Sequence, residues 1–186
     1  MGESLKTLKR YGLDETVEKL YPFELSGGMT RRILISTAVM ENPKLVIADE
    51  PTPGMHLEAA KRVLSHFREM ADEGTGVLLI THDLELALEV ADRIVVFYAG
   101  TCVEEASAAD FRDKGLLRHP YSKALYRAMP DHGFRAAPGA QPYLKDRPSG
   151  CPYAPRCEYR EARCLKEVNY VGLAGGMVRC VKAEEG

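Results

Sequence analysis

The sequence predicts an α/β fold: a mainly parallel sheet within residues 1–112 and a small cysteine-rich extension over residues 113–186. Three observations support this assignment. Short apolar runs alternate with helical patterns, in the order that parallel sheets require. Glycines and carboxylates stand where such sheets bind ligands, at helix starts and strand ends. Four of the five cysteines follow residue 150, which marks the extension as chemically distinct.

A small-residue turn precedes the first helix of the sheet region. Residues 1–24 are a polar, mostly helical stretch, and Ser26, Gly27 and Gly28 then lead into a helix predicted over residues 29–40. Their small side chains let backbone N–H groups approach a phosphate, and the helix adds the positive end of its dipole. Ser-Gly-Gly alone is more often an ordinary turn, so a phosphate contact is predicted only in combination with the carboxylates and the histidine downstream.

Two carboxylates follow the first predicted strand. Residues 45–48 form a continuous apolar run, typical of a parallel strand covered on both faces. Asp49 and Glu50 come at its carboxyl end, the edge at which α/β sheets bind ligands. We expect Asp49 to hold Mg²⁺ and Glu50 to polarise an attacking water.

A second strand ends at the same edge. The pattern predicts a helix over residues 57–72 and a strand over residues 76–80, which is followed by His82. The predicted sheet places His82 near Glu50, within reach of a γ-phosphate. A helix over residues 84–91 and a third strand over residues 93–98 complete the β–α–β–α–β order.

The sequence contains no match to the glycine-rich phosphate-binding loop that usually accompanies such carboxylates in nucleotide-binding proteins. No glycine in the sequence is followed by lysine, so the pattern G-x-x-x-x-G-K-[ST] does not occur. That loop supplies most of the phosphate-binding N–H groups in nucleotide enzymes. We therefore expect these residues alone to bind ATP poorly and not to hydrolyse it, and enzymatic activity of this chain stays open.

Together these motifs resemble the carboxyl-terminal part of an ATP-binding-cassette (ABC) ATPase, a P-loop NTPase, without its Walker A and Q-loop segments. Residues 25–29 match the LSGG signature, residues 45–50 the Walker B strand and catalytic glutamate, Glu50-Pro51-Thr52 the start of the D-loop, and His82 the switch histidine. The resemblance implies two such domains, as a homo- or heterodimer, that close around ATP and Mg²⁺ and drive transmembrane permease subunits.

In that arrangement the two groups of motifs serve different nucleotides. Ser26, Gly27 and Gly28 would contact ATP held mainly by the partner ATPase, whereas Asp49, Glu50 and His82 would serve the chain's own nucleotide. Two positions depart from the family pattern. His56 stands where the D-loop usually ends in aspartate, and Thr30-Arg31 replaces a basic residue and glutamine; neutral variation is the alternative explanation for the second.

Composition narrows the function classes. The net charge of −2 and the isoelectric point near 6.2 give no basic footprint, so we expect no nucleic-acid partner. No apolar run has transmembrane length, and the first residues do not form a signal peptide. We expect a cytoplasmic chain, and the resemblance places it peripherally on the inner face of the cell membrane.

Four cysteines form a second candidate site after a proline- and glycine-rich linker over residues 133–150. They are Cys151, Cys157, Cys164 and Cys180. Disulfides are disfavoured in the cytosol. A metal or an iron–sulfur cluster is therefore the preferred explanation for the clustered cysteines, and reduced thiols that fill a small core are the alternative. The spacing lacks the C-x2-C pairs of common zinc modules. Cys102 lies in a predicted strand, where we expect it to pack as a small apolar residue.

Residues 119–180 resemble the tail of the dipeptide, oligopeptide and nickel importer ATPases. The resemblance rests on the run from His119 to Pro130, on residues 150–157 and on residues 178–180. It implies that the four cysteines bind a [4Fe-4S] cluster, with Zn²⁺ as the alternative. It also implies uptake of peptides or nickel, with an extracytoplasmic substrate-binding protein as an indirect partner. Two alternatives stay open: a non-catalytic iron–sulfur regulatory module, and a non-transport ABC ATPase of DNA repair.

Overall fold

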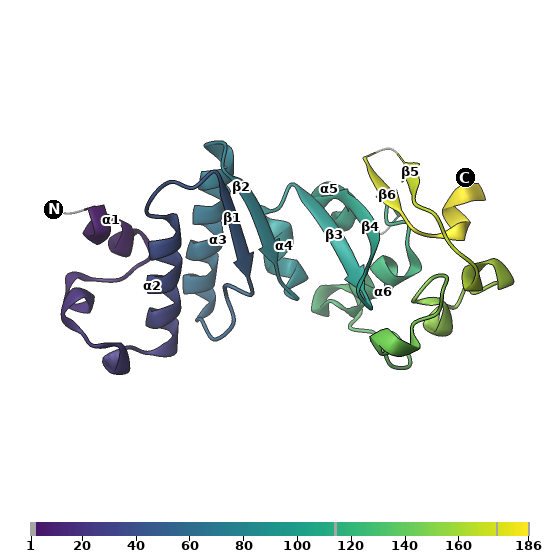
Figure 1. Ribbon diagram of the computed structural model, residues 1–186, viewed down its shortest axis with the longest axis horizontal. Coiled ribbons are helices and arrows are strands. Elements are labelled where there is room, and N and C mark those ends of the chain that lie inside the picture. Colours follow the sequence, from purple (N-terminus) through teal and green to yellow (C-terminus); the bar gives the residue numbers. More distant parts are fainter. Residues whose placement is uncertain (1–2, 114, 174, 186) are drawn as a thin grey trace. The chain divides into compact units, whose positions relative to one another are not determined.

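The chain folds into two compact units, Met1–Val90 and Ala91–Gly186. The computed structural model describes residues 3–113, 115–173 and 175–185 (Figure 1). None of the helices within those ranges combines the length and the apolar character needed to span a bilayer. Each unit has its own sheet.

The first unit packs helices against two parallel strands. Its elements are α1 (Glu3–Arg10), α2 (Gly27–Val39), β1 (Leu45–Asp49), α3 (Leu57–Asp72), β2 (Gly76–Ile80) and α4 (Leu84–Val90), with short 3₁₀ turns between α1 and α2. β1 and β2 pair in parallel, from Leu45 opposite Gly76 to Asp49 opposite Ile80. The strand ends therefore meet at one edge, as the sequence predicts.

One face of this sheet is buried by the helices. The core combines Val46 and Ala48 of β1 with residues from α2, from α3 and from the turn after α1, namely Tyr11, Val39, Val63, Leu64, Phe67 and Met70. The strand residues that point the other way, Leu45, Ile47, Leu78 and Ile80, stay about half exposed. β1 is thus buried on one face only, whereas its continuous apolar run predicts a strand buried on both faces.

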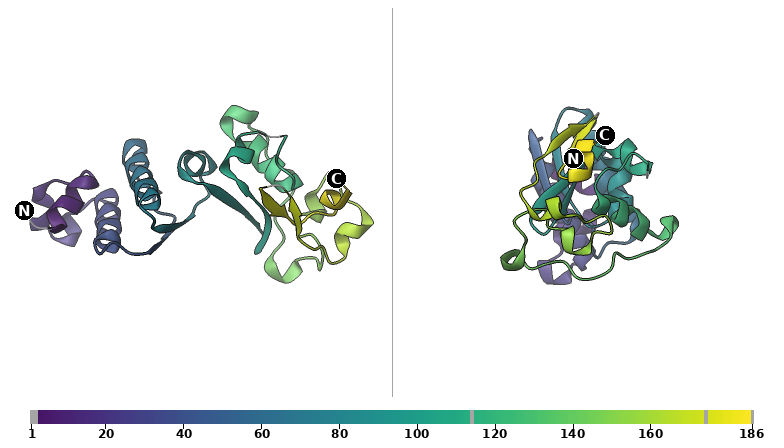
Figure 2. Two further views of the ribbon diagram at one scale, coloured as in Figure 1. Left: turned by 90° about the horizontal axis from the view of Figure 1, so that it is seen from above. Right: turned by 90° about the vertical axis from the view of Figure 1, so that its right-hand side faces the viewer.

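The second unit contains an antiparallel sheet of order β3-β4-β6-β5. Its elements are β3 (Arg93–Tyr98), β4 (Thr101–Ser107), α5 (Ala108–Arg112), α6 (Pro120–Ala128), β5 (Val171–Leu173) and β6 (Gly176–Val178). The hairpin of β5 and β6, coloured yellow, lies beside β4 in Figures 1 and 2.

The strand at residues 93–98 corrects the prediction of a mainly parallel sheet. It forms where expected, but it pairs antiparallel with β4. The connection is the two-residue turn Ala99-Gly100, and both residues have positive φ (47° and 72°). A turn of this kind reverses the chain into a hairpin, which only antiparallel strands can form. The fold is α/β, with a parallel sheet in one unit and an antiparallel sheet in the other.

Candidate functional site

Glu50 and His82 meet at the carboxyl edge of the parallel sheet. The Glu50 N–H donates to the Ile80 carbonyl (2.9 Å), which ties the turn after β1 to the end of β2. Glu50 has a φ of 45°, a left-handed conformation uncommon for a non-glycine residue. Its Oε1 atom lies 2.8 Å from His82 Nδ1. The carboxylate and the imidazole that the sequence places at one edge are in direct contact.

The second oxygen of Glu50 has no partner among the described residues. Glu50 Oε2 is buried and accepts no hydrogen bond. A buried carboxylate oxygen without a donor is costly and is found mainly where water or a ligand completes the site. Asp49, the last residue of β1, stands next to it with its side chain exposed. This edge therefore offers an acceptor for a water molecule beside an exposed carboxylate.

Glu50 raises the pKa of His82, first through the hydrogen bond to its carboxylate and then through its charge. We expect NMR titration to show His82 protonated to a higher pH in the wild type than in Glu50→Gln. Because the folded pKa is the higher one, the pair stabilises the fold fully below the unfolded pKa of about 6.5, and this contribution is lost as pH rises through the folded pKa. An unchanged His82 titration in Glu50→Gln would contradict the pairing.

The glycines of the signature lie at the amino end of α2. Ser26 caps this helix, and its Oγ accepts the Met29 N–H at 3.3 Å. Gly27 and Gly28 form the first helical turn, and a Cβ atom built on Gly27 would meet nothing within 4 Å. No side chain of Gly27 or Gly28 stands in the way of an anion at this helix start, where the sequence predicts a phosphate contact.

Arg31 links the signature helix to the D-loop. Its Nη1 atom donates to the Pro53 carbonyl at 2.6 Å. The neighbouring Arg32 points elsewhere, donating to the carbonyls of Tyr11 and Gly12 (both 3.1 Å). Sequence reasoning treats Arg31 only as a departure from the family pattern, because this contact depends on how α2 packs beside residues 51–56. Arg31, which departs from the family pattern, thus forms a direct hydrogen bond between α2 and the D-loop.

His56 occupies the N-cap of α3 without making a side-chain cap hydrogen bond. An aspartate there would accept an N–H of the first turn and favour the helix dipole. We expect His56→Asp to stabilise the first unit by about 1 kcal/mol, measured from the denaturant midpoint. The control is His56→Ala, which supplies no acceptor; equal midpoints for the two variants would contradict the prediction.

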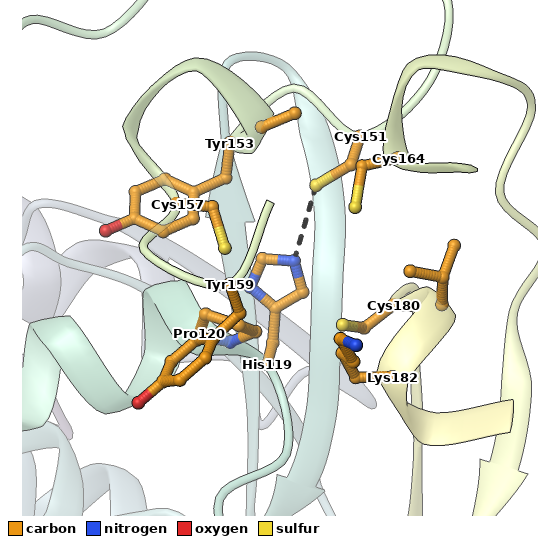
Figure 3. A pocket seen from close by; sticks show the side chains of 11 residues that line it. His119, Pro120, Cys151, Tyr153, Cys157, Tyr159, Cys164, Cys180 and Lys182 are labelled. Atoms are coloured by element: carbon orange, nitrogen blue, oxygen red, sulfur yellow. Dashed lines mark hydrogen bonds between the residues drawn. The ribbon is translucent and has the colours of Figure 1, made fainter. Parts of the chain in front are cut away.

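The four cysteines of the extension line one small cavity together with His119 (Figure 3). We call Cys151, Cys157, Cys164, Cys180 and His119 the thiol pocket. The Cys151 N–H donates to the Cys164 carbonyl at 2.8 Å, which holds two of the thiol-bearing segments side by side. Gly150 allows this approach, because a Cβ atom there would clash with the carbonyls of Cys164 and Lys166. Cys102 lies on β4, half-buried, as predicted.

Burial keeps most of these thiols protonated. It raises the pKa of Cys151 to about 11 and also raises the pKa of Cys157 and of Cys180. As the side chains stand, no group of three His, Cys, Asp or Glu residues in the described ranges is arranged to hold a metal ion. The donor set nevertheless suits a soft metal or an iron–sulfur cluster, because four thiols face one cavity.

His119 and Glu104 are the residues of this region that sequence reasoning missed. Both are completely buried. Burial lowers the pKa of His119 to about 3, so the ring is neutral. The Glu104 carboxylate accepts the backbone N–H groups of Arg118 (2.9 Å) and His119 (2.8 Å). In the sequence, His119 marks only the start of a helix, and Glu104 is one residue of an ordinary polar strand.

Two known protein families match this chain, one over its amino-terminal part and one over the region of the thiol pocket. The family described as "ABC transporter" matches residues 1–53, which include the signature and β1. The family described as "Oligopeptide/dipeptide transporter, C-terminal region" matches residues 103–164, from β4 to the third cysteine of the thiol pocket.

Individual relatives agree with these matches. The dipeptide transport ATP-binding protein DppD of Haemophilus influenzae is 39% identical over 181 residues, covering 91% of this chain and 54% of the relative. A putative peptide import ATP-binding protein of Brucella abortus is 36% identical over 186 residues, covering 95% of this chain and 55% of its own length. The chain thus spans about half the length of these curated relatives.

Solved structures match the fold. An ATP-binding cassette in a dimeric post-hydrolysis state with ADP and Pi aligns with a TM-score of 0.54 at 27% identity, covering 57% of this chain and 46% of that one. A nucleotide-free ATP-binding cassette gives the same TM-score and identity over 67% of this chain and 48% of its own. The α/β assignment is confirmed at this level.

Proposed function

The chain belongs to the ABC transporter ATPases, and from this premise we propose that it serves as part of the ATP-binding subunit of an ABC importer that takes up peptides or nickel. The observation that carries the proposal is the contact between Glu50 and His82 at 2.8 Å, at the sheet edge where Asp49 ends β1. In this proposal the pair supplies the general base and the γ-phosphate contact of ATP hydrolysis.

Each site residue has a separate role in this proposal. Glu50 accepts a proton from the attacking water, for which the unpartnered Oε2 is available. His82 contacts the γ-phosphate while Glu50 holds its ring. Asp49 holds the Mg²⁺ ion of Mg-ATP, which neutralises phosphate charge when bound. Ser26, Gly27 and Gly28 present N–H groups to ATP bound by a second ATPase subunit.

The proposed partners are those that this arrangement requires. A second ATPase subunit, identical or related, supplies the phosphate loop that faces Ser26 and Gly27. Transmembrane permease subunits receive the closing motion, and a substrate-binding protein outside the membrane delivers the cargo to them. The chain then lies at the cytoplasmic face of the membrane as a peripheral subunit. The relatives named as peptide import or dipeptide transport ATP-binding proteins support this assignment.

We further propose that Cys151, Cys157, Cys164 and Cys180 hold a [4Fe-4S] cluster, with Zn²⁺ as the alternative. The support is their shared cavity and the proline- and glycine-rich segment that leads into it. A cluster of this kind would tie together four segments that share little apolar core. Its role here is structural or regulatory, since no redox step belongs to ATP-driven transport.

Uptake by cells that carry the complete transporter tests the proposed function. Labelled dipeptide, labelled oligopeptide and ⁶³Ni²⁺ are supplied to cells with wild-type or Glu50→Gln protein. The proposal predicts that at least one cargo enters in the wild type and that Glu50→Gln stops its uptake. If all three enter at the same rate in the wild type and in the variant, the importer assignment is wrong.

A non-transport role is the second candidate. This role is favoured if uptake of the three cargoes does not depend on ATP turnover and the chain nevertheless holds stoichiometric iron. The chain would then be a regulatory module built around the thiol pocket. A DNA-repair ATPase has less support, because the net charge of −2 and the isoelectric point near 6.2 are not those of a basic nucleic-acid-binding domain.

A further inference from the structure

We propose that His119 donates a hydrogen bond from Nε2–H to the Cys151 sulfur, so that it tunes the proposed thiolate-ligated centre without being one of its ligands. The inference rests on the proposed cluster site and adds a fifth residue to it. Figure 3 shows the imidazole pointing into the cavity that the four thiols line. The Nε2 atom lies 3.7 Å from Cys151 Sγ, within the range of hydrogen bonds to sulfur.

The tautomer of His119 is determined by its other nitrogen. Nδ1 accepts the backbone N–H of Tyr121 at 3.0 Å, because His119 is the N-cap of α6. A nitrogen that accepts a hydrogen bond carries no proton, so the neutral ring must carry its proton on Nε2. The nitrogen that faces Cys151 is therefore a donor, and it has no lone pair with which to bind a metal.

The backbone of His119 is fixed as firmly as its ring. The buried Glu104 carboxylate accepts the His119 N–H at 2.8 Å, and the Arg118 guanidinium lies 3.8 Å from the same carboxylate. His119 is thus held by β4 on one side and by the first turn of α6 on the other. Such double support is what keeps a donor aimed at one sulfur.

The chemical consequence depends on the charge of the sulfur. A donor to a thiolate sulfur stabilises the more negative state of a cluster, so it raises the reduction potential. The bond is present in both redox states but is stronger in the reduced, more negative one, and only this difference enters the potential. Loss of the donor should therefore lower the ratio of reduced to oxidised cluster about tenfold at a fixed potential, which is a fall of about 59 mV for one electron.

Two measurements test the inference. The first uses the ¹⁵N-labelled chain without metal: a coupling across the Tyr121 N–H···Nδ1 bond identifies the His119 ring, and we expect its proton on Nε2. A proton on Nδ1 would overturn the proposal. This measurement needs no variant and no cluster, so its outcome is independent of the proposed iron site.

The second measurement compares cluster potentials in His119→Asn and wild type. Asparagine is a good N-cap and preserves the bond to Tyr121, but its side chain is too short to reach Cys151. The control, His132→Asn, replaces an exposed histidine of the same unit. We expect a lower potential only in His119→Asn. An unchanged potential with an intact cluster would refute the role of His119, whereas a chain that binds no iron would refute the cluster and leave the tautomer measurement to decide about His119.

Discussion

Replacing Glu50 with glutamine in the assembled importer is expected to lower ATP hydrolysis by a factor of about 10² to 10⁴, the usual contribution of a general base. Glutamine has nearly the same shape and keeps an oxygen acceptor, but it cannot take a proton from water. ATP should still bind, so nucleotide is expected to remain trapped in the closed dimer. Phosphate release and retained labelled ATP are the two quantities to measure.

The control for this variant is Glu41→Gln, which removes an exposed carboxylate just after α2. It should hydrolyse ATP at the wild-type rate. Undiminished hydrolysis in Glu50→Gln would contradict the role assigned to Glu50. Normal ATP binding in that variant is required as well, because loss of binding would assign Glu50 to nucleotide affinity instead of proton transfer.

Replacing Cys157 with serine is expected to remove the proposed cluster. The anaerobically purified wild type should contain about four iron atoms and as many acid-labile sulfides per chain, and the variant only a small fraction of this. Cys157 is the most accessible of the four cysteines, so the change should disturb packing least. Because metal binding and folding are coupled, the second unit should also lose stability in the variant.

The matched control is Cys102→Ser, since Cys102 is half-buried on β4 and does not line the thiol pocket. Its iron content should equal that of the wild type. Stoichiometric zinc without iron in the wild type would overturn the cluster assignment in favour of the alternative metal. Equal iron in both variants would show that Cys157 is not a ligand.

Local patterns predicted the elements of the first unit well. The helix expected over residues 57–72 is observed as Leu57–Asp72, and the strand over residues 76–80 as Gly76–Ile80. Their periodicity and the glycines around them act over a few residues, so the sequence alone determines them. The sequence also predicts that Glu50 and His82 lie together, because the carboxyl ends of parallel strands meet at one edge, and the two side chains are in contact.

Pairing and packing were harder to predict. The sequence predicts the strand at residues 93–98 but not its antiparallel partner, since the direction of pairing depends on the conformation of Ala99 and Gly100. The contact of Arg31 with Pro53 and the place of His119 beside Cys151 join segments 22 and 32 residues apart. Such contacts depend on tertiary packing, which periodicity does not encode.

ATP turnover by the polypeptide of residues 1–186 tests the central claim most directly. These residues carry the signature and the hydrolytic carboxylates but no phosphate loop to hold a nucleotide beside them. Phosphate release with Mg-ATP should therefore equal that of the same polypeptide carrying Glu50→Gln. Turnover above that background, lost in Glu50→Gln, would contradict the account.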